Sequence, residues 1–217
     1  SILAPYLDQH SDGGLAVAAR RLADDSSRLG MVAENLEREG IHDGKATIRR
    51  CLLVSKNLIG EPSVVMFRRA LAKRGFDVGF KQLVDLEMWF HLCDQAALAF
   101  VAQPLCAFRQ PTEQQTAVNA RDGGTRLEMF RLFRAYQHAA GRDDSGFTGQ
   151  LSYYTSIFAI IKGLRRSPVA SAEVDAAIAY LNELIPPAWL PLASSNYRVS
   201  KLTTTLVRSM RKRVVSF

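Results

Sequence analysis

The sequence predicts an α/β, helix-rich fold for this 217-residue chain. Short apolar or β-branched runs alternate with helical patterns over residues 1–117, and from residue 125 onward the spacing is helical only. The composition, 47% hydrophobic and 23% charged, is that of an ordinary globular protein. The length is sufficient for one large domain or two small ones with a core of their own.

The first half is expected to alternate helices with short strands. Residues 1–9 resemble the end of a helix closed by the turn-forming SDGG, and 14–25 a buried strand followed by a turn. Helical spacing of apolar residues predicts a helix over 28–40, with Gly40 as its stop. The further expected elements are a short helix at 45–57, a strand at 62–67, a short basic helix at 68–74, a helix at 82–95 and two extended pieces within 98–109 around Pro104.

The second half is expected to be all helical. Helices are predicted at 125–140, 147–164, 171–185 and about 199–215, with breaks at GRDDSG, RRSP and PPAWLPLASS. The charge balance changes near residues 117–124: residues 1–117 carry 14 Lys/Arg and 14 Asp/Glu, whereas 118–217 carry 14 and 7. We therefore predict two domains, 1–117 and 118–217, with the whole net charge of +7 in the second.

The cysteine pattern and the apolar runs favour a cytoplasmic protein. Cys51, Cys93 and Cys106 are an odd, scattered set with no partner His, as expected of small core residues in a reducing compartment. The longest apolar stretch, 96–108, is too short to span a bilayer, and the first residues lack the pattern of a signal peptide.

The last predicted helix, 199–217, is amphipathic and basic. One side carries valine, leucine and methionine, while the other carries lysine and arginine without any acid. Such a helix suits an anionic membrane surface at the inner face of the membrane, and it equally suits a terminal helix that packs on its own domain. Nucleic acid is not an expected partner, because the region has no binding motif and few aromatics among its basic residues.

Two carboxylates stand in the stretch VDLEMWFHL. Residues three and four apart share a helical face, which puts Asp85 with Met88 and Trp89 on the apolar side. Glu87 falls with His91 on the polar side and is predicted to be a solvated surface charge. Asp85 fits an N-cap or first-turn aspartate, and it also fits a fixed, oriented base for proton abstraction.

The surrounding residues 57–116 resemble the acceptor-side half of family 2 glycosyltransferases, which have the GT-A fold. The pattern runs from Gly-x-Pro-Ser and Phe-Arg-Arg, through Gly-Phe-Asp and a helix opening with Asp-x-(Asp/Glu)-(Leu/Met)-Trp, to Pro-Leu-x-x-(Tyr/Phe)-Arg. The matching residues here are Asn57, Gly60, Pro62, Ser63, Phe67, Arg68, Gly75, Phe76, Asp77, Asp85, Glu87, Trp89, Pro104, Leu105, Phe108 and Arg109. The resemblance implies a partial GT-A-like domain over 1–117, followed by an all-α extension.

The resemblance implies an inverting transferase. It would move a sugar from a nucleotide-sugar donor to a glycan or lipid-linked acceptor, as in the biosynthesis of cell-envelope polysaccharides. Asp85 matches the catalytic base. The implied substrate-binding residues are Gly60, Pro62, Ser63 and Trp89 at the acceptor, with Arg109 and Gln110 toward the diphosphate. Two alternatives stay open: an ordinary core role for Trp89 and a simple turn at Gly60 and Pro62.

Two departures from the family pattern limit what these residues can do. The nucleotide-binding half, with its metal-binding Asp-x-Asp, is expected upstream of residue 1, and Asp24-Asp25 is interpreted as a surface turn. Pro111 stands where the family often has His. We therefore assign no metal ligand here, expect Mg²⁺ or Mn²⁺ only in the full-length enzyme, and predict that this chain alone is inactive. The alternative function is a non-catalytic helical binding or assembly module that keeps a glycosyltransferase-like remnant.

Overall fold

The computed structural model describes residues 2–23, 29–33, 36, 38–109, 124–140, 146–167 and 171–201. It is mixed α/β and rich in helix, as predicted. The chain divides into two compact units, residues 1–141 and 142–217. The predicted boundary after residue 117 therefore differs from the division in the structure, because helix α5 (Gly124–Ala140) packs on α2 and α3 of the first unit.

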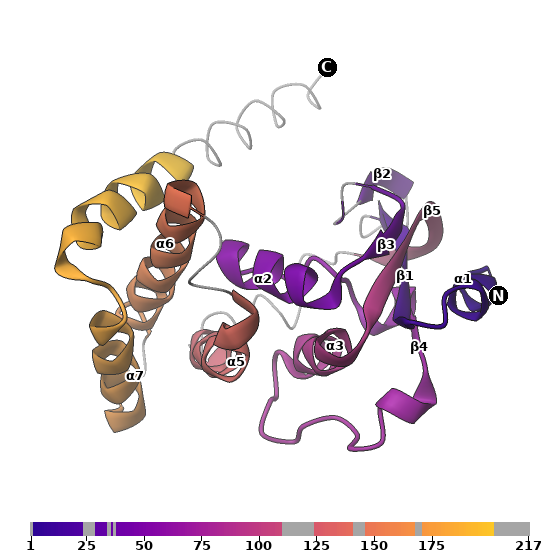
Figure 1. Ribbon diagram of the computed structural model, residues 1–217, viewed down its shortest axis with the longest axis horizontal. Helices are drawn as coiled ribbons and strands as arrows, with labels where there is room; N and C mark the ends of the chain where they lie inside the picture. Colours follow the sequence, from indigo (N-terminus) through magenta and orange to yellow (C-terminus); the bar gives the residue numbers. More distant parts are fainter. Residues whose placement is uncertain are drawn as a thin grey trace. The chain divides into compact units, whose positions relative to one another are not determined.

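A five-stranded mixed sheet forms the centre of the first unit (Figure 1). Its order is β2-β1-β5-β3, and β4 also pairs with β1. Strands β1 (Gly13–Ala23) and β5 (Ala97–Arg109) are parallel neighbours. The short strands β2 (Leu29–Ala33), β3 (Gly40–His42) and β4 (Val65–Phe67) pair antiparallel with them. Residues 13–19 of β1 are continuously buried, as expected of a central strand covered on both faces.

Helices cover both faces of this sheet. Helix α1 (Leu3–Gln9) packs on one face, where Leu3 and Leu7 form an apolar cluster with alternate residues of β1 and β5. The opposite face is covered by α2 (Gly44–Val54) and α3 (Val84–Gln95) (Figure 1). Gly44 lets α2 begin against the end of α3, since a Cβ atom there would lie 2.0 Å from the carbonyl oxygen of Cys93.

The helix predicted over 28–40 is wrong. Leu29–Ala33 is strand β2, which returns antiparallel along the end of β1 with Arg20 opposite Ala33. Backbone hydrogen bonds to an existing strand outweigh a helical spacing of three apolar residues, because that spacing is a weak local preference.

Residues 62–74 and 97–109 also differ in detail from the prediction. Pro62–Val64 is a 3-10 turn before the short β4, and only Arg69–Leu71 of the predicted basic helix is helical, again as 3-10. Pro104 does not divide the last strand: β5 is continuous, and the register along β1 shifts between Ala18 and Ala19 where Pro104 enters. Such an irregularity accommodates a residue that lacks a backbone N–H.

The second unit is helical, as predicted. Helices α6 (Gly146–Leu164) and α7 (Ala172–Glu183) bury their apolar sides, and the 3-10 turn Pro187–Trp189 leads into a helix over 190–201. That last helix begins earlier than the predicted residue 199. The basic part of the tail, 202–217, lies outside the described residues. Among the helices that the structure describes, none has the length and apolarity needed to cross a bilayer.

Candidate functional site

Asp85 lies in the first turn of α3, on the second helical residue, so it is not the N-cap. A single residue separates the end of α3 from the start of β5. Because α3 packs on the sheet and runs back along it, its first turn lies toward the carboxyl ends of β1 and β5. The side chain is half-buried, and its Oδ1 accepts a hydrogen bond of 2.7 Å from the amide of Leu86. Burial is the main cause that raises the pKa of Asp85 above its ordinary value, and the nearby Glu61 carboxylate adds to it.

A buried hydrogen bond holds the turn around Gly60 against α3, and a second, partly buried one stabilises the turn itself. The indole Nε1 of Trp89 donates to the carbonyl oxygen of Gly60 at 3.0 Å, and Nδ2 of Asn57 donates to the same oxygen at 3.0 Å. Gly60 has a φ of +126°, a conformation that glycine adopts without strain. Trp89 is 1% exposed, and its ring packs against Phe67 and Phe76. Trp89 therefore has the environment of a core residue, in line with the alternative given above.

Asp85 and Trp89 lie one helical turn apart, so the Gly60 turn adjoins the same face of α3 that carries Asp85. Pro62 and Ser63 continue this turn and are exposed. Arg109 is exposed at the last position of β5, opposite Ala23 of β1. The structure therefore brings together Asp85, Trp89 and the Gly60–Ser63 turn. Gln110, the remaining predicted site residue, lies outside the described part of the chain.

The sequence pattern did not identify Arg20 and Glu61, two charged residues whose side chains meet at this turn. Arg20, from β1, places its Nε 2.9 Å from Oε2 of Glu61, and its guanidinium carbon lies 5.9 Å from the ring centre of Phe108 on β5. A charged residue that follows seven buried positions of a strand is the signal that singles out Arg20.

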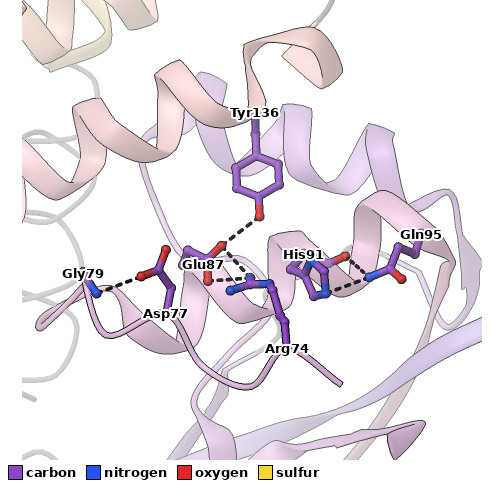
Figure 2. Close-up of polar contacts among 7 residues, drawn as sticks. All are labelled: Arg74, Asp77, Gly79, Glu87, His91, Gln95 and Tyr136. Carbon is purple, nitrogen blue, oxygen red and sulfur yellow. Dashed lines mark hydrogen bonds and ion pairs between the residues drawn. The ribbon is translucent and has the colours of Figure 1, made fainter. Parts of the chain in front are cut away.

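Glu87 is buried, and the prediction of a solvated surface charge is wrong. Its side chain belongs to a polar network. The Nη2 atom of Arg74 donates hydrogen bonds of 2.7 Å to both of its carboxylate oxygens. The hydroxyl of Tyr136 donates to Oε1 at 2.9 Å (Figure 2). Burial and the adjacent Glu87 carboxylate raise the pKa of Tyr136. Helix α5 covers this face of α3, which the helical pattern of α3 alone could not show.

A carboxylate of α5, that of Glu128, fixes the start of α3. Glu128 is 6% exposed, and its two oxygens accept hydrogen bonds of 2.8 Å from the amides of Lys81, Gln82 and Leu83. A helix begins with amides that have no partner inside the helix, and a carboxylate from another element satisfies such groups here. Glu128 thus fixes the segment that enters α3, two residues before Asp85.

The described residues contain no arrangement suited to a resident metal ion. Within the ranges given above, no three or more His, Cys, Asp or Glu side chains gather as ligands would. Asp24 and Asp25 lie outside those ranges. The divalent metal that the resemblance implies is expected in the full-length enzyme, from ligands upstream of residue 1, and it stays a prediction.

The comparisons with known proteins are consistent in assigning no function. Over 112 residues the chain is 35% identical to an uncharacterized protein, MT1568, of Mycobacterium tuberculosis (strain CDC 1551 / Oshkosh). The match covers 48% of this chain and 35% of that protein, so the chain corresponds to about a third of the relative's length. No family model and no solved structure matches the chain. The relative's name states no activity.

Proposed function

We propose that this chain is the acceptor-side part of an inverting family 2 glycosyltransferase, with Asp85 as the catalytic base. The observation that carries the proposal is the setting of Asp85: a half-buried carboxylate of raised pKa, beside the Gly60 turn, on a helix start fixed by Glu128. A general base works best when it is held in position and its pKa lies closer to the working pH. The ordered resemblance over residues 57–116 supplies the reaction class.

In the proposed reaction, Asp85 accepts the proton of an acceptor hydroxyl group. The freed oxygen electrons form the new bond to the anomeric carbon of the nucleotide-sugar. The bond from that carbon to the diphosphate oxygen breaks, and the nucleoside diphosphate leaves with the bonding electrons. One displacement inverts the anomeric configuration. No step is routed through a metal ion.

The test is an Asp85→Asn change in the full-length protein that contains this chain. Release of nucleoside diphosphate from UDP-glucose, UDP-N-acetylglucosamine and GDP-mannose would be measured with methyl glycosides as acceptor probes. We expect kcat to fall about 10²- to 10⁴-fold, since asparagine cannot accept the proton. Asp94→Asn is the matched control, because Asp94 lies on the same helix and pairs with His138 instead. Full activity of the Asp85→Asn variant would contradict the base assignment.

The same variant should fold normally and be more stable than the parent at neutral pH. Folding raises the pKa of Asp85, so between its unfolded and folded pKa values the folded state binds more protons. The stability of the parent therefore falls as the pH rises through that window, and the penalty persists above it. Denaturation at pH 7 should show the gain from Asp85→Asn, and the gain should vanish below the unfolded-state pKa. A loss of stability at pH 7 would mean that the side chain has a structural role.

The alternative, a non-catalytic binding or assembly module, is favoured by the complete enclosure of Trp89. An acceptor could not stack on that ring without moving the turn. The transfer assay separates the two functions: a module gives no nucleoside diphosphate release in either the parent or the Asp85→Asn protein.

A further inference from the structure

Glu61 lies in the Gly60 turn, beside the face of α3 that carries the proposed base. The carbonyl oxygen of Gly60, the preceding residue, accepts the indole hydrogen bond of Trp89 at 3.0 Å. Trp89 follows Asp85 by one helical turn. Glu61 therefore enters the site on a backbone that is already fixed to α3, and its charge contributes to the raised pKa of Asp85.

The orientation of Glu61 is set from the other side by Arg20. Their side chains are 29% and 11% exposed, and the ion pair joins Nε to Oε2 at 2.9 Å. The N–H is not aligned with the oxygen, so neither atom has a hydrogen-bond partner among the described residues. Oε2 itself is buried, and the exposed part of the side chain belongs to its other atoms. The carboxylate is thus anchored at one oxygen without having its acceptor capacity filled.

A sugar supplies hydroxyl groups, which donate hydrogen bonds to such a carboxylate. Hydroxyl groups donate short, charge-assisted hydrogen bonds to ionised carboxylates, and neighbouring hydroxyls of one sugar can reach two carboxylates. We propose that Glu61 is a second acceptor-site carboxylate, which binds a hydroxyl group of the sugar acceptor adjacent to the one that Asp85 deprotonates, and that Arg20 positions it. This inference rests on the proposed function and specifies the acceptor as a sugar hydroxyl pair.

The binding test uses the 217-residue chain and saturation-transfer NMR. Methyl glucoside, methyl mannoside, methyl galactoside and methyl rhamnoside serve as probes. We expect at least one glycoside to bind, and Glu61→Gln to weaken its binding about tenfold or more, since a hydrogen bond to a charged group is lost. Arg20→Met should weaken binding too, and Arg20→Lys should restore part of it. Asp8→Asn, an exposed change of the same charge on α1, should have no effect.

A titration of the chain labelled with ¹³C at aspartate tests the same contact without a ligand. Glu61 is a charged group that acts on Asp85, and Arg20 pairs with Glu61 in turn. Glu61→Gln should lower the pKa of Asp85, because a neighbouring negative charge is removed. Absence of glycoside binding, or binding and an Asp85 pKa that are both unchanged in Glu61→Gln, would overturn the inference.

The two proposals can fail separately. If Asp85→Asn abolishes transfer by the full-length protein while Glu61→Gln leaves its acceptor KM unchanged, the inference about Glu61 is wrong and the proposed function stands. If Glu61 is required for glycoside binding while no nucleotide-sugar is turned over, the sugar site stands and the transferase proposal is wrong.

Discussion

Asp85 and Glu87, two residues apart on α3, have different environments. Asp85 is half-buried beside the Gly60 turn, whereas Glu87 is 5% exposed and bound by Arg74 and Tyr136 (Figure 2). A buried carboxylate persists only when it is paired and hydrogen-bonded, and Glu87 has both kinds of partner. Its role is therefore to join α3, α5 and the Arg74 segment.

The buried bond between Tyr136 and Glu87 should contribute measurably to stability. We expect Tyr136→Phe to lower the free energy of unfolding by about 1.5–3 kcal/mol, because a buried carboxylate loses one of its donors. The matched control is Tyr6→Phe, since the Tyr6 hydroxyl donates to Glu39 at an exposed site. That change should cost less than about 1 kcal/mol. Equal losses in urea denaturation would contradict a special role for the buried pair.

At the scale of elements, α5 fixes the start of the helix that carries the proposed base. Glu128 accepts hydrogen bonds from three consecutive backbone amides, Lys81, Gln82 and Leu83. Tyr136 lies on the same helix, and its ring packs edge-on against Phe90 of α3. The entry into α3 thus depends on side chains from a helix that follows it by about thirty residues in the sequence.

Removing the charge of Glu128 should loosen this entry segment. We expect Glu128→Gln to lower stability by about 1–3 kcal/mol and to speed hydrogen exchange at the amides of residues 81–83, because a neutral amide has only one accepting oxygen. Glu39→Gln is the control, since Glu39 accepts a single amide, that of Ala102, at an exposed site. Unchanged exchange at residues 81–83 would show that the contacts do not hold the segment.

At the scale of the whole molecule, the division after Gly141 predicts which fragments fold. A fragment of residues 1–117 lacks α5, and with it Glu128, Phe133 and Tyr136, all of which are buried. It would leave Glu87 without its tyrosine partner and expose the apolar face of α2 and α3. We expect this fragment to aggregate or to unfold without cooperativity.

The longer fragment 1–141 should instead show cooperative thermal unfolding by circular dichroism. The separate fragment 142–217 should retain helical signal, because α6 and α7 bury their own apolar residues against each other. Cooperative unfolding of 1–117 would contradict the division after Gly141.

Much of the fold could be predicted because the hydrophobic periodicity of individual segments indicates their secondary structure. The buried strand in 14–25, helix α2 after its N-cap Asp43, helix α3 and the helices α5 to α7 follow from hydrophobic spacing and capping. Cys51 and Cys93 are buried as predicted, whereas Cys106, also predicted to be a core residue, is only partly buried. The misassigned segment 29–33 is a strand because β1 offers it an edge, which no local pattern contains.

The sequence by itself determined most of the helices, the buried strand β1 and the position of Asp85 on the inner side of a helix start. Only the tertiary structure decided the environments of the charged groups. Glu87 is buried because α5 covers it, Glu128 fixes a helix start in another element, and Arg20 meets Glu61 because β1 lies beside the Gly60 turn. Local periodicity reports which side of a helix or strand is apolar, whereas burial of a polar side chain depends on partners distant in the chain.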